Sequence, residues 1–291
     1  MSKVSVIIPN YNNAKWLPKC LDSALAQDQL LEIITVDDHS EDNSFSVLES
    51  YQSKYPDLLK VYCNPNKGAN SARDYGYSKS SGEYIQWLDS DDELLPGKFK
   101  SQLEKLKSTG ADIVYSDWRI DFWDGDTKIS SEQKEYGDYD DFLLELIKDN
   151  WTSPNNYLLQ RSIADKLDKG VGWNADTRVG QDREYFTTAG LIGATFTYQP
   201  GMFAVYNKQS SGSISAIDFG VRLKLNQVLE ARFRDLIINH KELTRAKKSK
   251  YLKVLNTHKV KACFYNKKIS FDSVILPWKV DWEIMHWKMK V

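Results

Sequence analysis

A cluster of carboxylates lies at residues 89–92, directly behind the apolar run at 84–88. It reads Asp89, Ser90, Asp91, Asp92, and the apolar run predicts a short buried strand that ends there. Ionised carboxylates that are crowded together repel one another, so packing explains the cluster poorly. Their oxygen atoms suit Mg²⁺ or Mn²⁺, and such a cation can in turn hold a diphosphate. The alternative is an acidic turn with a helix cap behind it.

Three further polar side chains follow predicted strands nearer the N-terminus. The ring of Tyr11 could stack on a base, and Asp38 could accept a hydrogen bond from a base imide. Arg73 could pair with a base or with a diphosphate. Taken singly, each has a plainer interpretation, as a loop tyrosine, a turn or cap residue, and a solvated helix charge. Their common placement at strand ends favours one nucleotide site.

The elements that must position these residues alternate between strand and helix over the first hundred residues. Such alternation predicts a parallel sheet with ligands at the carboxyl ends of its strands. The predicted strands are 4–8, 32–36, 58–63 and 83–88, and the predicted helices are 16–25, 44–55 and 70–80.

Past residue 96 the signals change. The stretch at 121–141 is polar, aromatic and weakly periodic, which predicts a long loop. The remaining predictions are helices at 99–106 and 142–147, strands at 112–118, 195–198 and 203–206, and helical structure from 219 onward.

The charge is divided unevenly along the 291 residues, although the net charge is only −1. From Lys241 onward there are 13 lysines and arginines against four acidic residues, which leaves 26 basic and 36 acidic residues before it. An acidic body with a basic tail suggests an anionic partner for the tail, either a membrane surface or a nucleic acid. The absence of RNA- or DNA-binding motifs argues against a nucleic acid.

Three widely spaced cysteines fit neither a disulfide framework nor a Cys-x-x-Cys metal site. A reducing cytoplasm is therefore the expected location. We expect no signal peptide before the first strand, and no stretch of the sequence approaches the roughly 18 apolar residues of a membrane helix. We expect a cytoplasmic protein, with peripheral attachment to the inner face of the cell membrane through the basic tail as a further expectation.

The motifs together resemble glycosyltransferase family 2. The resemblance is ordered and closely spaced over about the first hundred residues. It rests on 4–12, on 36–40 (Val-Asp-Asp-His-Ser), on Asn66-Lys67-Gly68-Ala69 through Arg73, and on Gly82-Glu83-Tyr84 through Asp92.

The resemblance implies an α/β GT-A fold, with a mainly parallel, Rossmann-like sheet flanked by helices and a C-terminal helical extension. It divides the chain into a nucleotide-sugar-binding half (1–107), an acceptor-binding half (108–218) and a basic helical extension (219–291). It also implies a nucleotide-diphosphate sugar as donor, with uridine favoured, and a divalent metal, Mn²⁺ or Mg²⁺. Carried over by position, Asp91 is the principal metal ligand, and the residues lining the nucleotide are Pro9, Tyr11, Asp38 and Arg73, with Asp89 and Ser90 beside the ribose or the metal.

The implied inverting mechanism requires a general base for the acceptor hydroxyl. None of the four histidines falls in the acceptor half, so a carboxylate is expected. Residues 180–186 resemble the family's acidic motif, in which Asp182 occupies the base position and Gln181 replaces the usual Glu. Asp176 and Glu184 are the fallback candidates. The plainer interpretation of Asp182 is a carboxylate that complements a helix dipole.

A second departure lies beyond the base, where many relatives carry an Arg and a His. The equivalent stretch here, 206–213, contains Lys208 but no histidine. Lys208 is therefore the candidate for the positive charge near the leaving diphosphate.

Aromatic residues add two expectations about the acceptor. Trp151 and the amides of Asn155 and Asn156 would suit a pyranose, although a buried Trp at a helix end fits equally well. In the tail, lysines alternate with Trp278, Trp282 and Trp287; this pattern fits an element lying on anionic lipid headgroups, and helices packed on the protein are the alternative.

We therefore expect a metal-dependent hexosyltransferase that extends a glycan or lipid-linked acceptor in capsule or lipopolysaccharide synthesis. A non-catalytic nucleotide-sugar-binding protein on the same scaffold is the alternative. A nucleotidyltransferase ranks lower, because residues 10–14 lack the glycine-rich phosphate loop of that class.

Overall fold

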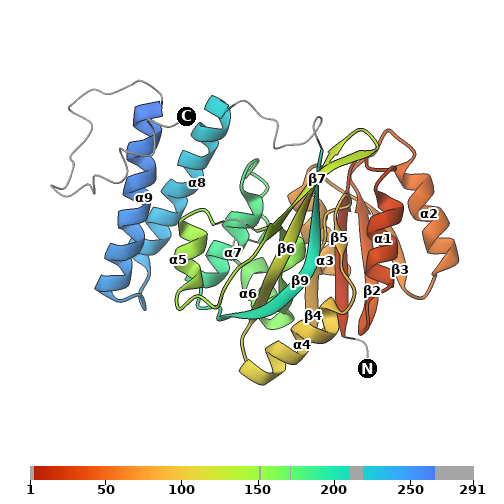
Figure 1. Ribbon diagram of the computed structural model, residues 1–291, viewed down its shortest axis with the longest axis horizontal. Coiled ribbons are helices and arrows are strands. Elements are labelled where there is room, and N and C mark those ends of the chain that lie inside the picture. Colours follow the sequence, from red (N-terminus) through yellow and green to blue (C-terminus); the bar gives the residue numbers. More distant parts are fainter. Residues whose placement is uncertain (1–2, 151, 171, 210–218, 266–291) are drawn as a thin grey trace.

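The computed structural model describes residues 3–150, 152–170, 172–209 and 219–265, and its elements surround one nine-stranded sheet (Figure 1). The first half of the sheet is wholly parallel, in the order β3-β2-β1-β4. Its strands are β1 (Val4–Asn10), β2 (Leu30–Asp37), β3 (Leu59–Cys63) and β4 (Tyr84–Trp87). All seven residues of β1 are buried, as expected for a strand covered by helices on both faces.

Three helices connect these strands: α1 (Leu17–Leu25), α2 (Ser44–Lys54) and α3 (Ala69–Lys79). Helix α3 lies very close to the sheet, because a Cβ added to Gly76 would stand 2.6 Å from the Ile7 side chain. Glycine at this position therefore lets α3 approach β1, and the preceding turn of the helix carries Arg73 to the carboxyl end of the sheet.

The second half of the sheet is mixed. Strand β8 (Leu158–Gln160) pairs antiparallel with both β4 and β6 (Ile113–Asp124). Strand β6 runs parallel to β9 (Phe196–Gln209), and the short β5 (Glu93–Leu94) pairs antiparallel with β9. Because β5 directly follows residues 89–92, this pairing attaches the acidic cluster to β9.

Two of the expected elements are wrong. Residues 121–134 are not a loop: β6 continues to Asp124, turns at Gly125 and returns as β7 (Thr127–Lys134), which forms an antiparallel hairpin. The two short strands predicted at 195–198 and 203–206 are one strand, β9, whose pairing with β6 shifts register between Ser116 and Trp118. Pro200 and Gly201 (φ +126°) lie at this irregularity.

The remaining helices cover the second half. Their bounds are α4 (Lys98–Thr109), α5 (Phe142–Ile147), the 3₁₀ turn η1 (Pro154–Asn156), α6 (Arg161–Asp168), α7 (Gln181–Leu191), α8 (Phe219–Asn239) and α9 (Arg245–Tyr265).

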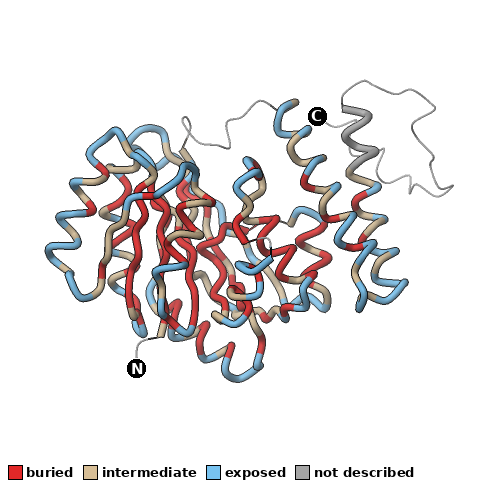
Figure 2. Tube along the Cα trace, turned by 180° about the vertical axis from the view of Figure 1, so that it is seen from behind, coloured by how far each residue is buried: buried red, intermediate tan, exposed pale blue. Residues whose placement is uncertain are grey.

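The helical extension packs on the body through a core of its own. Phe233, Ile237 and Tyr251 are buried against Leu143 and Ile147 of α5, so α8 and α9 lie side by side at one end of the molecule (Figure 1). The buried residues otherwise concentrate in the strands of the sheet (Figure 2). Within the described part of the chain, every helix is too short or too polar to cross a bilayer.

Candidate functional site

Two adjacent aspartates, Asp37 and Asp38, lie at the carboxyl end of β2 and have different roles. Asp37 is buried and accepts hydrogen bonds from Asn10 Nδ2 (2.8 Å) and from the Ser40 amide (3.0 Å), so it closes the turn. Asp38 accepts from the Gly68 amide (2.8 Å) and from Asn64 Nδ2 (2.7 Å). Asp38 therefore joins the ends of β2 and β3 to the start of α3.

Pro9 and Tyr11 flank the end of β1. Pro9 is buried within the strand, opposite Val36 of β2. The Tyr11 side chain is 54% exposed, so its ring is open to a ligand at the edge of the sheet. An exposed aromatic ring beside the buried strand ends suits stacking on a planar base.

Arg73 is the hub of the site. Its Nη2 donates to Asp89 Oδ1 at 2.6 Å, and its Nη1 donates to Asn70 Oδ1 and to Gln181 Oε1, each at 3.1 Å. The guanidinium also lies 4.4 Å from the centre of the Trp173 ring. Only the buried Nε lacks a hydrogen-bond partner in the structure. One buried cation thus joins α3, the acidic cluster and the start of α7.

The residues at 89–92, here called the acidic loop, have distinct environments. Asp89 is ion-paired with Arg73. Asp92 is buried and accepts from Ser153 Oγ (3.1 Å), Asn155 Nδ2 (3.1 Å) and the Asn207 amide (2.9 Å), so it holds the loop to the protein. Asp91 keeps part of its surface accessible and forms no ion pair with any described residue.

Burial and the neighbouring Asp89 carboxylate raise the pKa of Asp91 to about 7. An anion that is disfavoured in this way is stabilised by a cation. The described residues contain no group of three or more His, Cys, Asp and Glu side chains arranged to hold a metal by themselves. The donor set therefore fits a cation such as Mg²⁺, which binds through one or two carboxylates together with phosphates and water.

Asn207 fixes the acidic loop from the side of β9. Its Nδ2 donates to the Asp91 carbonyl (2.8 Å) and to Glu93 Oε1 (3.0 Å), and its Oδ1 accepts from Trp123 Nε1 (2.9 Å). On the opposite side, Asn13 Nδ2 donates to Ser90 Oγ at 2.7 Å. These contacts hold the loop between β1 and the β6–β7 hairpin.

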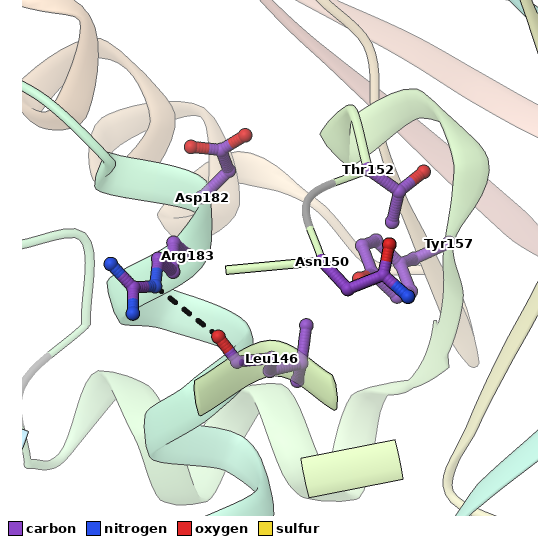
Figure 3. A pocket seen from close by; sticks show the side chains of 6 residues that line it. All are labelled: Leu146, Asn150, Thr152, Tyr157, Asp182 and Arg183. Atoms are coloured by element: carbon purple, nitrogen blue, oxygen red, sulfur yellow. Dashed lines mark hydrogen bonds between the residues drawn. The ribbon is translucent and has the colours of Figure 1, made fainter. Parts of the chain in front are cut away.

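Asp182 lies in the first turn of α7, whose N-terminus is favourable for a carboxylate. It lines a narrow pocket, too tight to admit a water molecule and here called the Asp182 pocket, together with Leu146, Asn150, Thr152, Tyr157 and Arg183 (Figure 3). Asp182 and Arg183 come from one turn of α7, whereas Asn150, Thr152 and Tyr157 come from the facing segment (Figure 3). Arg183 donates from Nε to the Leu146 carbonyl at 3.2 Å, which anchors α7 on α5.

The fallback carboxylates differ from Asp182 in their surroundings. Glu184 is buried and accepts hydrogen bonds from Thr177 Oγ1 and Arg232 Nη1, so it joins α7 to α8. Asp176 is exposed on the preceding segment. Asp182 alone among the three lines a pocket described here.

Lys208 lies outside the cluster around Arg73. Its Nζ is 5.4 Å from the centre of the Phe122 ring, and the side chain lines an open groove beside the β6–β7 hairpin. Of the other expected acceptor residues, Asn155 and Asn156 are fully buried and bond to the protein. Trp151 and the tryptophans of the tail lie outside the described residues.

Sequence reasoning missed Gln181, Trp173 and Asn207 as parts of the site. In the sequence, Gln181 stands out only as a neutral residue in place of the usual Glu. Trp173 belongs to no pattern that points to the acidic loop, and within the stretch 206–213 it is Asn207 rather than Lys208 that reaches the loop through tertiary contacts.

The model of the family described as Glycosyl transferase family 2 matches residues 5–186. An uncharacterized glycosyltransferase of Nostoc sp. is 35% identical over 136 residues, which are 46% of this chain and 42% of the relative. A GalNAc(5)-diNAcBac-PP-undecaprenol beta-1,3-glucosyltransferase of Campylobacter jejuni is 40% identical over 116 residues, 39% of this chain and 37% of the relative. The match to a cholesterol galactosyltransferase of Borreliella burgdorferi is 36% identical over 121 residues, 41% and 34% of the two chains. The chain thus covers less than half the length of these curated relatives.

Solved structures share the fold over more of the chain. TarS of S. aureus (residues 1–349, in complex with UDP-GlcNAc) superimposes with a TM-score of 0.70 and 20% identity, covering 93% of this chain and 77% of TarS. A mannosyltransferase of Pyrobaculum calidifontis, in complex with GDP-Man and Mn²⁺, gives a TM-score of 0.59 and 16% identity over 92% and 76% of the two chains. At identities of 20% and 16%, these two likenesses show a shared fold alone.

Proposed function

Because the chain belongs to glycosyl transferase family 2, we propose that it transfers a hexose from a nucleotide-diphosphate sugar to a glycan or lipid-linked acceptor, with inversion. The observation that carries the proposal is the contact of Arg73 with both Asp89 and Gln181. Through this one side chain, the loop expected to face the donor is joined to the helix turn that carries Asp182. A donor site and a base on adjoining elements are what a single displacement requires.

The donor is proposed to lie along the carboxyl ends of β1, β2 and β4. Tyr11 would stack on the base, with Pro9 beside it, and Asp38 would accept a hydrogen bond from the base. Arg73, Asp89 and Ser90 would lie beside the ribose and the diphosphate. Lys208 would add positive charge near the leaving group. Uridine is favoured as the base, in keeping with the UDP-GlcNAc complex of TarS.

Asp91 is proposed as the residue that holds Mn²⁺ or Mg²⁺. When bound, the cation neutralises charge on the departing diphosphate. The support is that Asp91 is not fully buried as a residue and forms no ion pair with a described residue, whereas the carboxylates of Asp89 and Asp92 are engaged by protein groups. The Mn²⁺ in the mannosyltransferase complex is consistent with this assignment.

Asp182 is proposed as the general base. It would accept the proton of the acceptor hydroxyl as the hydroxyl oxygen attacks the anomeric carbon and the bond to the diphosphate breaks. Its position on the Asp182 pocket supports the assignment, since the pocket offers polar groups from Asn150 and Thr152 on the opposite side. Arg183, anchored on α5, would hold this turn of α7 in place.

The acceptor is proposed to belong to surface polysaccharide synthesis, in a capsule or lipopolysaccharide pathway. The names of two relatives, an undecaprenol-linked glucosyltransferase and a cholesterol galactosyltransferase, both involve lipid-bearing acceptors. We further propose that the basic tail brings the protein to an anionic membrane surface. Lys247, Lys248 and Lys250 of α9 belong to that tail.

Calorimetric titration with UDP, GDP and dTDP, each with and without Mn²⁺, tests the proposal. Binding of one nucleotide that is at least tenfold tighter with the metal would support the donor site and identify the nucleotide of the donor. No binding of any of the three to folded protein would refute the proposed function.

A further inference from the structure

An open groove of about 610 Å³ lies along the face of the β6–β7 hairpin. Trp118, Ile120 and Phe122 form its floor, because alternate residues of β6 point to the same side of the sheet. Tyr136, Tyr139 and Asn150 line one end, and Lys208 lines the other. The rim carries Glu132, Gln133, Lys134 and Glu135. We call this the hairpin groove.

The hairpin groove lies next to the Asp182 pocket. Asn150 lines both. The groove therefore ends beside the residues that face Asp182.

The opposite end of the groove adjoins the acidic loop. Lys208 directly follows Asn207, which donates to the Asp91 carbonyl. Trp123, which directly follows the floor residue Phe122, donates a hydrogen bond from its Nε1 to Asn207 Oδ1. The groove thus lies along the hairpin between the turn that carries the proposed base and the loop that carries the proposed metal ligand.

The chemistry of the lining suits neutral sugars. Aromatic rings pack against the apolar faces of pyranoses, while carboxylates, amides and ammonium groups bond to the hydroxyls at the ring edges. Two acidic and two basic side chains line the groove, and Glu132 is ion-paired with Lys134. A polyanion or polycation would gain little from this balanced lining. The volume falls within the ~300–1,000 Å³ of sites for drug-sized ligands, so it can accept more than the one reacting sugar.

We propose that the hairpin groove binds a neutral oligosaccharide, the sugars of the acceptor that precede the one receiving the new hexose. The inference rests on the proposed function and goes beyond it, since it makes the acceptor a glycan chain of at least two sugars rather than a bare lipid. Tyr139, which is 36% exposed, is the aromatic residue of the groove most open to contact with such a chain.

Saturation-transfer NMR with cellotriose, laminaritriose and chitotriose tests the proposal, with the matching monosaccharides for comparison. We expect at least one trisaccharide to bind ten times more tightly than its monosaccharide. Tyr139→Ala should weaken that binding at least tenfold, whereas Tyr139→Phe, which keeps the ring, should stay within threefold of the parent protein. Glu135→Ala, an exposed position that cannot disturb the core, should weaken it about threefold.

Ile129→Ala is the matched control, because Ile129 is a 62% exposed residue of β7 that does not line the groove. Trisaccharide binding that is absent, equal to monosaccharide binding, or unchanged in Tyr139→Ala and Glu135→Ala would overturn the proposal. Tighter binding of a sulfated trisaccharide than of all neutral ones would do the same. UDP titration of the same samples separates the two failures: with UDP bound and no glycan bound, only the groove assignment fails, and with neither bound, the proposed function fails too.

Discussion

Arg73 donates a 2.6 Å hydrogen bond to Asp89, across the boundary between α3 and the acidic loop. The same guanidinium bonds to Gln181 at the start of α7. Gln181 stands where the family resemblance leads one to expect Glu. A glutamate there would be a second anion competing for Arg73, whereas the glutamine accepts a hydrogen bond and leaves the full positive charge facing Asp89 and the proposed diphosphate.

Arg73→Lys tests this hub. Lysine keeps the charge but cannot bond to Asp89 and Gln181 at once or stack on Trp173. We expect UDP affinity to fall about tenfold, which corresponds to about 1.4 kcal/mol, and the free energy of unfolding to fall by about 2 kcal/mol. Calorimetry and urea denaturation measure the two effects. Lys107→Ala, at an exposed position of α4, is the control and should change neither the UDP affinity nor the free energy of unfolding. If Arg73→Lys behaved like the parent protein in both measurements, the contacts of Arg73 would not be what holds the site together.

Asp91→Ala and Asp92→Ala should separate metal binding from structure. Asp91→Ala should abolish the effect of Mn²⁺ on UDP binding and metal-dependent turnover, because it removes the proposed ligand, while the fold stays as stable as before. Asp92→Ala leaves the buried Asn155 amide and the Asn207 N–H without their acceptor, so we expect unfolding to become easier by about 2–4 kcal/mol. Retention of the Mn²⁺ effect in Asp91→Ala would mean that another group holds the metal.

Asp182→Asn should lower sugar transfer by about 10²–10⁴-fold, the range expected for loss of a general base. UDP binding should stay within threefold of the parent protein, since Asp182 is proposed to face the acceptor. Radiolabelled transfer and calorimetry measure the two quantities. Asp176→Asn, on the exposed neighbouring segment, is the control and should keep transfer. Near-normal transfer by Asp182→Asn would show that the base lies elsewhere.

Asp74 should make stability depend on pH in a predictable direction. Burial raises the pKa of Asp74 to about 6, although the hydrogen bond that its carboxylate accepts from the Trp173 amide acts in the opposite direction and lowers the pKa. Because the folded state binds this proton more tightly than the unfolded state, ionisation of Asp74 destabilises the fold progressively as the pH rises from about 4 to about 6.

Asp74→Asn should therefore raise the free energy of unfolding by about 2 kcal/mol at pH 7.5, allowing for the partial exposure of the carboxyl. The gain over the parent protein should vanish near pH 4, where both forms are neutral. Urea denaturation from pH 4 to 8 measures the difference, with the exposed Asp57→Asn as a control. A gain that is the same at every pH would contradict the raised pKa.

The first hundred residues show how far sequence patterns reach. The strands ending at Asn10 and Asp37 were predicted from runs rich in β-branched residues, and nearly every residue of both strands is buried. The hairpin was not predicted, because every residue of β7 before Lys134 is exposed and carries no alternating pattern. Strand β7 forms because β6 offers it hydrogen-bonding partners, and that information is not local to residues 127–134.

The sequence alone determined which residue types stand at the carboxyl ends of the strands, and hence the family and the expected chemistry. The different surroundings of Asp89, Asp91 and Asp92 were decided by the tertiary structure. Adjacent carboxylates have nearly the same intrinsic properties, and their roles diverge only through partners that are distant in the chain: Arg73 for Asp89, and Ser153, Asn155 and Asn207 for Asp92. Burial and partner charges set the state of an ionisable group, and both arise only when the chain has folded.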